Sequence, residues 1–97
     1  MDEQIRKGVL RGIILKGLDL EYPNEMSDAA LQPMLQGSGY GDITKLEVRR
    51  DLEYLGGEGY LEFGRKSRDL WLVKLTSKGV KLLEGRIDED PGILIAR

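Results

Sequence analysis

Apolar residues repeat at helical spacing near the start of the chain. Between residues 3 and 18, two series recur every four positions, which predicts an amphipathic helix: Ile5, Val9 and Ile13, and Leu10, Ile14 and Leu18. This apolar surface is broad, so we expect the helix to be buried on more than one side, with a second subunit as one possible cover. Gly8 and Gly12 lie one turn apart, and we interpret them as tolerated helix-weakening residues rather than as a site of close helix contact.

Two further helices are predicted from their start signals. Ser27 can cap a helix that Pro33 should keep short or bent. Thr44 and Glu47 have the pattern of a capping box. In this motif the threonine hydroxyl accepts a hydrogen bond from a backbone N–H, and the glutamate side chain reaches back to the start of the helix. In the helix that follows, at about 44–56, one face is apolar and is expected to pack inward. The opposite face carries Leu46, Arg49, Arg50 and Glu53, with Lys45 at its edge.

The next segment has the composition of a β-hairpin. Residues 60–63 and 70–75 are rich in aromatic and branched side chains, and residues 64–69 would form a polar tip between them. Trp71 is predicted to be a core residue. Thr76 can cap a last helix at about 76–84, and residues 85–97 would form an extended tail. This order predicts a single α+β domain, 1–97, with a winged helix-turn-helix fold: a three-helix core, a wing at about 60–75 and a C-terminal helix.

The charge of the chain is unevenly distributed. The net charge is −2, but residues 44–81 hold 9 basic and 6 acidic side chains, or +3. Residues 1–43 hold 4 basic and 7 acidic side chains, and residues 82–97 hold 2 and 4. The excess of positive charge therefore coincides with the predicted recognition helix and wing, which favours nucleic-acid recognition.

The absence of two residue types restricts the chemistry. The chain has no cysteine and no histidine, which removes thiol chemistry, the commonest metal ligands and the commonest general base. We therefore expect no enzyme activity, no cofactor and no metal. The lack of cysteine fits a cytoplasmic location, and no apolar run is long enough to suggest a membrane span.

The predicted recognition helix and wing suggest contact with double-stranded DNA. Arg49 and Arg50 could bind guanine edges or phosphates, and Leu46 could contact a thymine methyl group. The alternative is an ordinary solvated face, since Glu47 and Glu53 beside the arginines would repel phosphates. The cations of the predicted wing, Arg65, Lys66 and Arg68, could contact the DNA phosphates or enter the minor groove. The alternative is that they only keep an exposed turn soluble. The predicted DNA-binding residues are Lys45, Leu46, Arg49, Arg50, Arg65, Lys66 and Arg68.

Two other patterns invite a functional interpretation. Residues 88–92, Asp-Glu-Asp-Pro-Gly, lack the ligand alternation of a calcium loop, so a solvated acidic turn is expected. Residues 56–59, Gly-Gly-Glu-Gly, fit no phosphate-loop pattern and are expected to end the third helix.

Several short motifs carry a resemblance to known proteins. Leu75-Thr76-Ser77-Lys78-Gly79 after a basic hairpin is similar to the strand-to-helix junction of multiple-antibiotic-resistance-type and arsenical-resistance-type winged-helix regulators. A longer series resembles small winged-helix proteins of Mu-like bacteriophages and prophages: residues 48–55, 59–61, 70–72, 83–85 and 90–93. The resemblance implies a winged-helix fold and a phage or prophage DNA-binding protein, which we expect to be a transcriptional regulator.

The resemblance also bears on partners. The chain has no room for the long flanking helices that form the ligand pocket of the larger regulators, so no small-molecule ligand is expected. A homodimer is expected, because residues 93–95 and the first helix present more apolar surface than one small domain needs. The rival hypothesis is a winged-helix protein-interaction module in a phage or replication assembly that does not bind DNA.

Overall fold

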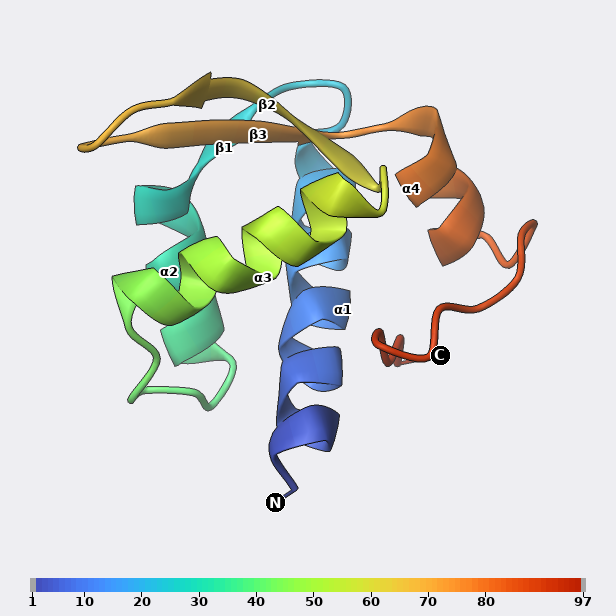
Figure 1. The fold of residues 1–97 in the computed structure, drawn as a ribbon, viewed down its shortest axis with the longest axis horizontal. Coiled ribbons are helices and arrows are strands. Elements are labelled where there is room, and N and C mark those ends of the chain that lie inside the picture. Colours follow the sequence, from blue (N-terminus) through green and yellow to red (C-terminus); the bar gives the residue numbers. More distant parts are fainter. Residues whose placement is uncertain (1, 97) are drawn as a thin grey trace.

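The computed structural model describes residues 2–96, which form four helices and one three-stranded antiparallel sheet (Figure 1). The fold is therefore α+β, as expected. The elements in chain order are α1 (Glu3–Glu21), β1 (Met26–Ser27), α2 (Asp28–Gly37), α3 (Lys45–Gly57), β2 (Leu61–Lys66), β3 (Trp71–Leu75) and α4 (Ser77–Leu83). None of the helices in residues 2–96 combines the length and apolar character needed to cross a membrane.

Short polar side chains start three of the helices, as the sequence indicates. Ser27 Oγ accepts from the Ala30 amide at 3.0 Å, and Thr44 Oγ1 accepts from the Glu47 amide at 3.1 Å. Thr76 Oγ1 does the same for α4. The capping box at Thr44 is only half formed, however. The Glu47 carboxylate does not return to the start of α3 but pairs with Arg6 of α1, so that part of the prediction is wrong.

The sheet has the order β1-β3-β2. The two-residue strand β1 was not predicted; it pairs Met26 with Val73 at the edge of β3. β2 and β3 form the expected hairpin, but its tip is shorter than residues 64–69, since the strands reach Lys66 and resume at Trp71. A register shift between Phe63 and Arg65 interrupts the pairing.

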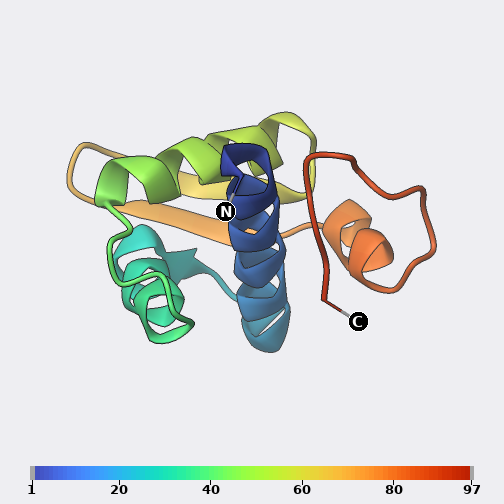
Figure 2. The same ribbon diagram turned by 90° about the horizontal axis from the view of Figure 1, so that it is seen from below.

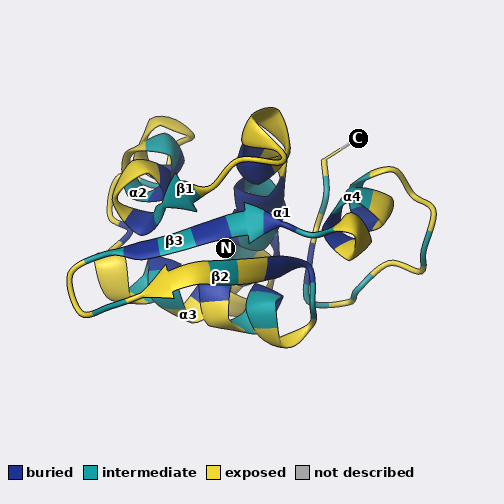
Figure 3. Cartoon of the chain, turned by 90° about the horizontal axis from the view of Figure 1, so that it is seen from above, coloured by how far each residue is buried: buried dark blue, intermediate teal, exposed yellow. Residues whose placement is uncertain are grey.

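The helices cover one face of the sheet and the core lies between them (Figures 1 and 3). Side chains of β3 alternate between buried and half-buried positions, as expected for a strand with one covered face. Trp71 is buried, as predicted. The core also takes apolar residues from all four helices and from the tail: Leu10, Ile14, Leu18, Leu31, Leu35, Val48, Leu52, Leu55, Leu82 and Ile93, among others.

The segment after α4 returns along α1, between α1 and α4 (Figure 2). The Leu94 amide donates to the Gly8 carbonyl at 3.0 Å. A Cβ atom at Gly12 would overlap the Leu94 carbonyl oxygen. The two glycines therefore permit a close backbone approach, and their interpretation as merely tolerated residues is wrong.

Candidate nucleic-acid interface

The start of α3 and the turn of the β2–β3 hairpin lie against each other. Lys45 Nζ is 3.5 Å from the Asp69 carbonyl oxygen, and Arg49 Nη1 donates to the Arg68 carbonyl at 3.0 Å. The two segments that the sequence analysis assigned to a DNA-binding face are thus neighbours in space.

Arg49 is not on the exposed face of α3 where it was expected. Its Nε donates to Asp28 Oδ2 at 2.7 Å, and its side chain is only 16% exposed. The guanidinium lies over the Trp71 ring, 4.7 Å from the ring centre. The side chain is therefore held between α2, α3 and the hairpin. Its geometry is that of a residue that positions the hairpin. The prediction that Arg49 lies on the open face of α3 is therefore wrong.

Asp28 is the other half of this buried pair. The carboxylate is 1% exposed and also accepts from the Trp71 amide at 3.1 Å. Burial alone raises the pKa of Asp28, but the hydrogen bond from the Trp71 amide and the Arg49 guanidinium together hold that pKa below its ordinary value. The sequence marked Asp28 only as a favourable residue in the first turn of α2. No local pattern could reveal partners 21 and 43 positions away.

The open face of α3 carries Leu46, Arg50 and Glu53, as predicted. Leu46 is 59% exposed. Arg50 is exposed and makes no ion pair or hydrogen bond within residues 2–96. It is therefore a free cation on the solvent side of the helix.

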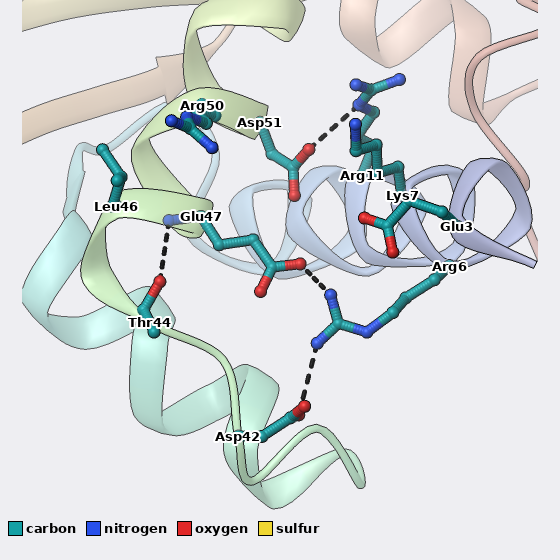
Figure 4. A pocket seen from close by; sticks show the side chains of 10 residues that line it. All are labelled: Glu3, Arg6, Lys7, Arg11, Asp42, Thr44, Leu46, Glu47, Arg50 and Asp51. Carbon is teal, nitrogen blue, oxygen red and sulfur yellow. Dashed lines mark hydrogen bonds and ion pairs between the residues drawn. The ribbon is translucent and has the colours of Figure 1, made fainter. Parts of the chain in front are cut away.

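A cleft of about 460 Å³ separates α3 from the first half of α1 (Figure 4). Its walls contribute four cations and four carboxylates, together with Thr44 and Leu46: Arg6, Lys7, Arg11 and Arg50, and Glu3, Asp42, Glu47 and Asp51. Arg6 pairs with both Asp42 and Glu47. Arg11 pairs with Asp51, so two of the four cations are neutralised, and Lys7 and Arg50 have no ion pair in the described part of the chain.

Arg11 and Asp51 close the inner end of the cleft. Arg11 Nε donates to Asp51 Oδ1 at 3.1 Å, and Asp51 Oδ2 is buried with no hydrogen-bond partner among the described residues. Burial is the largest effect on Asp51 and raises the pKa of its carboxyl group, although Arg11 acts in the opposite direction. Arg6 and Arg11 were not singled out by sequence reasoning, because they lie within an apparently apolar helical pattern.

The three hairpin cations do not share one face. Arg65 is opposite Leu72 and Lys66 is opposite Trp71, so the pleat places Arg65 and Lys66 on different faces of the hairpin. Lys66 Nζ lies 4.8 Å from the centres of both the Phe63 and Trp71 rings.

Lys66 has a carboxylate close to its ammonium group, whereas Arg68 has no ion pair in the described residues. Lys66 Nζ is 3.9 Å from a Glu53 carboxylate oxygen. The Arg68 side chain is exposed at the turn and has no ion pair in the described residues.

Asp90 attaches the segment after α4 to α3 and to the start of the hairpin through hydrogen bonds. This carboxylate accepts from Tyr54 Oη at 2.6 Å, from Tyr60 Oη at 3.2 Å and from the Gly92 amide at 2.8 Å. The hydrogen bond to Asp90, followed by burial, raises the pKa of Tyr54 to about 12. Burial alone raises the pKa of Asp90, but the hydrogen bonds outweigh it and lower that pKa. The expectation of a solvated acidic turn is therefore wrong for Asp90.

Comparison with known proteins gives no family assignment. No family model matches the chain, and no curated protein matches it significantly.

Proposed function

We propose that this chain is a small winged-helix DNA-binding protein, and that it serves as a transcriptional regulator of a phage or prophage. The arrangement of helices around a β1-β3-β2 sheet is compatible with that fold. The observation that carries the proposal is the contact between the start of α3 and the hairpin turn, made by Lys45 with the Asp69 carbonyl and by Arg49 with the Arg68 carbonyl. In a helix-turn-helix protein the second helix of the motif enters the major groove, and here that helix is α3.

The buried contacts alter the assignment of roles. Lys45, Leu46 and Arg50 on α3, with Arg68 at the turn, would contact the duplex directly. Lys66 would contribute less, because Glu53 is nearby. Arg65 lies on the other face of the hairpin and would reach phosphate only if the hairpin straddled the backbone. Arg49 would act indirectly, by holding the hairpin against α3.

The number of free cations sets the expected salt dependence. Lys45, Arg50 and Arg68 have no carboxylate partner in the described residues, so they could neutralise three phosphates. Three contacts correspond to a slope of about −2.7 in a plot of log affinity against log salt concentration, or about a 40-fold loss between 50 and 200 mM salt. The affinity of one subunit is therefore expected to be modest.

The test is fluorescence anisotropy with a labelled DNA duplex over a range of salt concentrations. A variant with Arg50→Ala and Arg68→Ala should bind more weakly and reduce the slope to about −1. The matched control carries Lys81→Ala and Arg86→Ala, which remove the same charge from exposed positions in and after α4. Equal effects of the two double variants, or no salt-dependent binding by the wild-type chain, would contradict the proposal.

A second candidate is a protein-interaction module. It is favoured by one observation: Leu46, 59% exposed, lies beside a cleft whose charges are mostly paired. Such a mixed surface suits a protein partner better than a phosphate backbone. Binding of the chain to phage proteins that is abolished by Leu46→Ala, together with no DNA binding at low salt, would favour this candidate.

A further inference from the structure

The inner end of the cleft between α1 and α3 holds a carboxylate oxygen that the chain leaves without a donor. The Asp51 side chain is 3% exposed, and its Oδ1 accepts from Arg11 Nε at 3.1 Å. Its Oδ2 is buried with no hydrogen-bond partner among residues 2–96. Figure 4 shows this carboxyl group between the two helices, directed into the cleft. A buried acceptor without a donor is costly, so a group that donates to Oδ2 would be bound favourably.

The arginines around Asp51 are held by other groups. Besides its bond to Asp51, Arg11 donates through Nη1 to the Gly92 carbonyl at 3.1 Å, and its guanidinium lies 3.7 Å from the centre of the Tyr54 ring. Arg6 pairs with two other carboxylates of the cleft. Neither arginine can therefore turn to Asp51 Oδ2 without giving up a contact that it already has.

Two cations of the cleft remain available to a ligand. Lys7 of α1 and Arg50 of α3 line it from its two walls, and neither has an ion pair or a hydrogen bond in the described residues. Lys7 is half-buried and close enough to Asp51 to act on the pKa of its carboxyl group, but it does not pair with it. Because the Lys7 side chain is long and unbound, a ligand can reach Oδ2 by displacing it.

The charges of the lining limit the kind of ligand. Four cations and four carboxylates surround the cleft, so its net charge is zero. A chain of phosphates would meet repulsion there, whereas one phosphate monoester, with about −1.5 to −2 charges near neutral pH, matches the two unpaired cations. The volume of about 460 Å³ lies within the range of small-molecule sites.

We propose that this cleft binds a small phosphate monoester that also carries hydroxyl or amino donors, such as a sugar phosphate or a nucleotide. The phosphate lies between Lys7 and Arg50, and an O–H or N–H of the same molecule donates to Asp51 Oδ2. The sequence analysis expected no small-molecule ligand because the chain lacks the long flanking helices of larger regulators. The cleft between α1 and α3 does not need those helices.

The ligand also has a consequence for DNA binding, which rests on the proposed function. Arg50 lines the cleft and is one of the residues proposed to contact the duplex. The phosphate of the ligand and a phosphate of the duplex would therefore compete for the same guanidinium, and the ligand would weaken DNA binding.

The test is isothermal titration calorimetry of the full chain in the absence of DNA, so its failure would leave the proposed function standing. The probes are glucose 6-phosphate, adenosine monophosphate and methyl phosphate, which has the charge of a monoester but no hydroxyl or amino group. At least one of the first two should bind at least about tenfold more tightly than methyl phosphate, because only they can donate to Asp51. Which of the two binds more tightly identifies the source of the phosphate.

Two variants separate the donor from the phosphate. Lys7→Ala and Asp51→Asn should each weaken binding of the better ester about tenfold or more. Lys81→Ala is the matched control, because Lys81 is an exposed lysine on α4 away from the cleft. Asp51→Asn also alters the contact with Arg11, so its fold is checked by circular dichroism, and Lys7→Ala provides the comparison that breaks no described contact.

A measurement on the wild type tests Asp51 directly. Burial raises the pKa of Asp51, and a donor at Oδ2 favours the charged form. The carbon resonance of the Asp51 carboxyl group should therefore titrate at lower pH with the ester bound than with methyl phosphate bound. No binding of either ester at about 5 mM, equal affinity for methyl phosphate, or equal losses in Lys7→Ala and Lys81→Ala would overturn the proposal.

Discussion

The buried pair between Asp28 and Arg49 provides the sharpest prediction of the structure. Asp28→Asn keeps the size of the side chain but removes its charge. Arg49 Nε then faces an uncharged group, and the guanidinium stays in a site where the side chain is only 16% exposed. Arg49 Nη2 is already buried without a hydrogen-bond partner in the described residues, so the loss has no local compensation.

The expected loss is large for a domain of this size. Removing one partner of a buried ion pair costs about 3 kcal/mol, whereas a small domain has a total free energy of unfolding of about 5–15 kcal/mol. In a domain of 97 residues this corresponds to a fall in Tm of about 12 °C or more. The Asp28 pKa is lowered, so the stabilisation by its carboxylate is present above pH of about 4 and is lost as the pH falls through the lowered pKa.

The assay is thermal and urea unfolding followed by circular dichroism at neutral pH. Asp88→Asn is the control, because Asp88 is exposed in the tail and has no ion pair in the described residues. Arg49→Gln should also destabilise the fold, and the double variant should lose less than the sum of the two single losses. A Tm within about 3 °C of the control, or strictly additive losses, would refute the reasoning.

Two further predictions concern the tail. Gly12→Ala should displace Leu94 from α1 and lower the free energy of unfolding by about 1–3 kcal/mol, measured by urea unfolding, whereas Gly41→Ala has open space around it and should change stability little. The Tyr54 phenol should titrate near pH 12 in an ultraviolet absorbance titration, and Tyr54→Phe should remove that component. Because this pKa is raised, the stabilisation from neutral Tyr54 is full below pH of about 10 and is lost as the pH rises towards 12; a wild-type titration complete by pH of about 10 would contradict it.

Local signals in the sequence identified the helices well. The predicted helices at 44–56 and 76–84 correspond to Lys45–Gly57 and Ser77–Leu83. Their starts were found because Thr44 and Thr76 bond amides only three residues away. Capping is a short-range interaction, so its pattern is visible in the sequence.

The features that were missed depend on distant partners. Arg49 was placed on the open face because a helical wheel does not include Asp28 or the hairpin. Gly8 and Gly12 were misread because the backbone that approaches them lies more than 80 positions further along the chain. The strand β1 has only two residues, too few to show an alternating pattern. Contacts of this range follow from tertiary packing and leave no periodic signal.

The central claim is that α3 and the hairpin turn form one surface for a duplex. It is tested most directly by following backbone amide resonances of the labelled chain during titration with a short DNA duplex at low salt. The account predicts that residues 45–50 and 67–70 shift together. Shifts confined to α1 or α4, or no shifts at low salt, would contradict it.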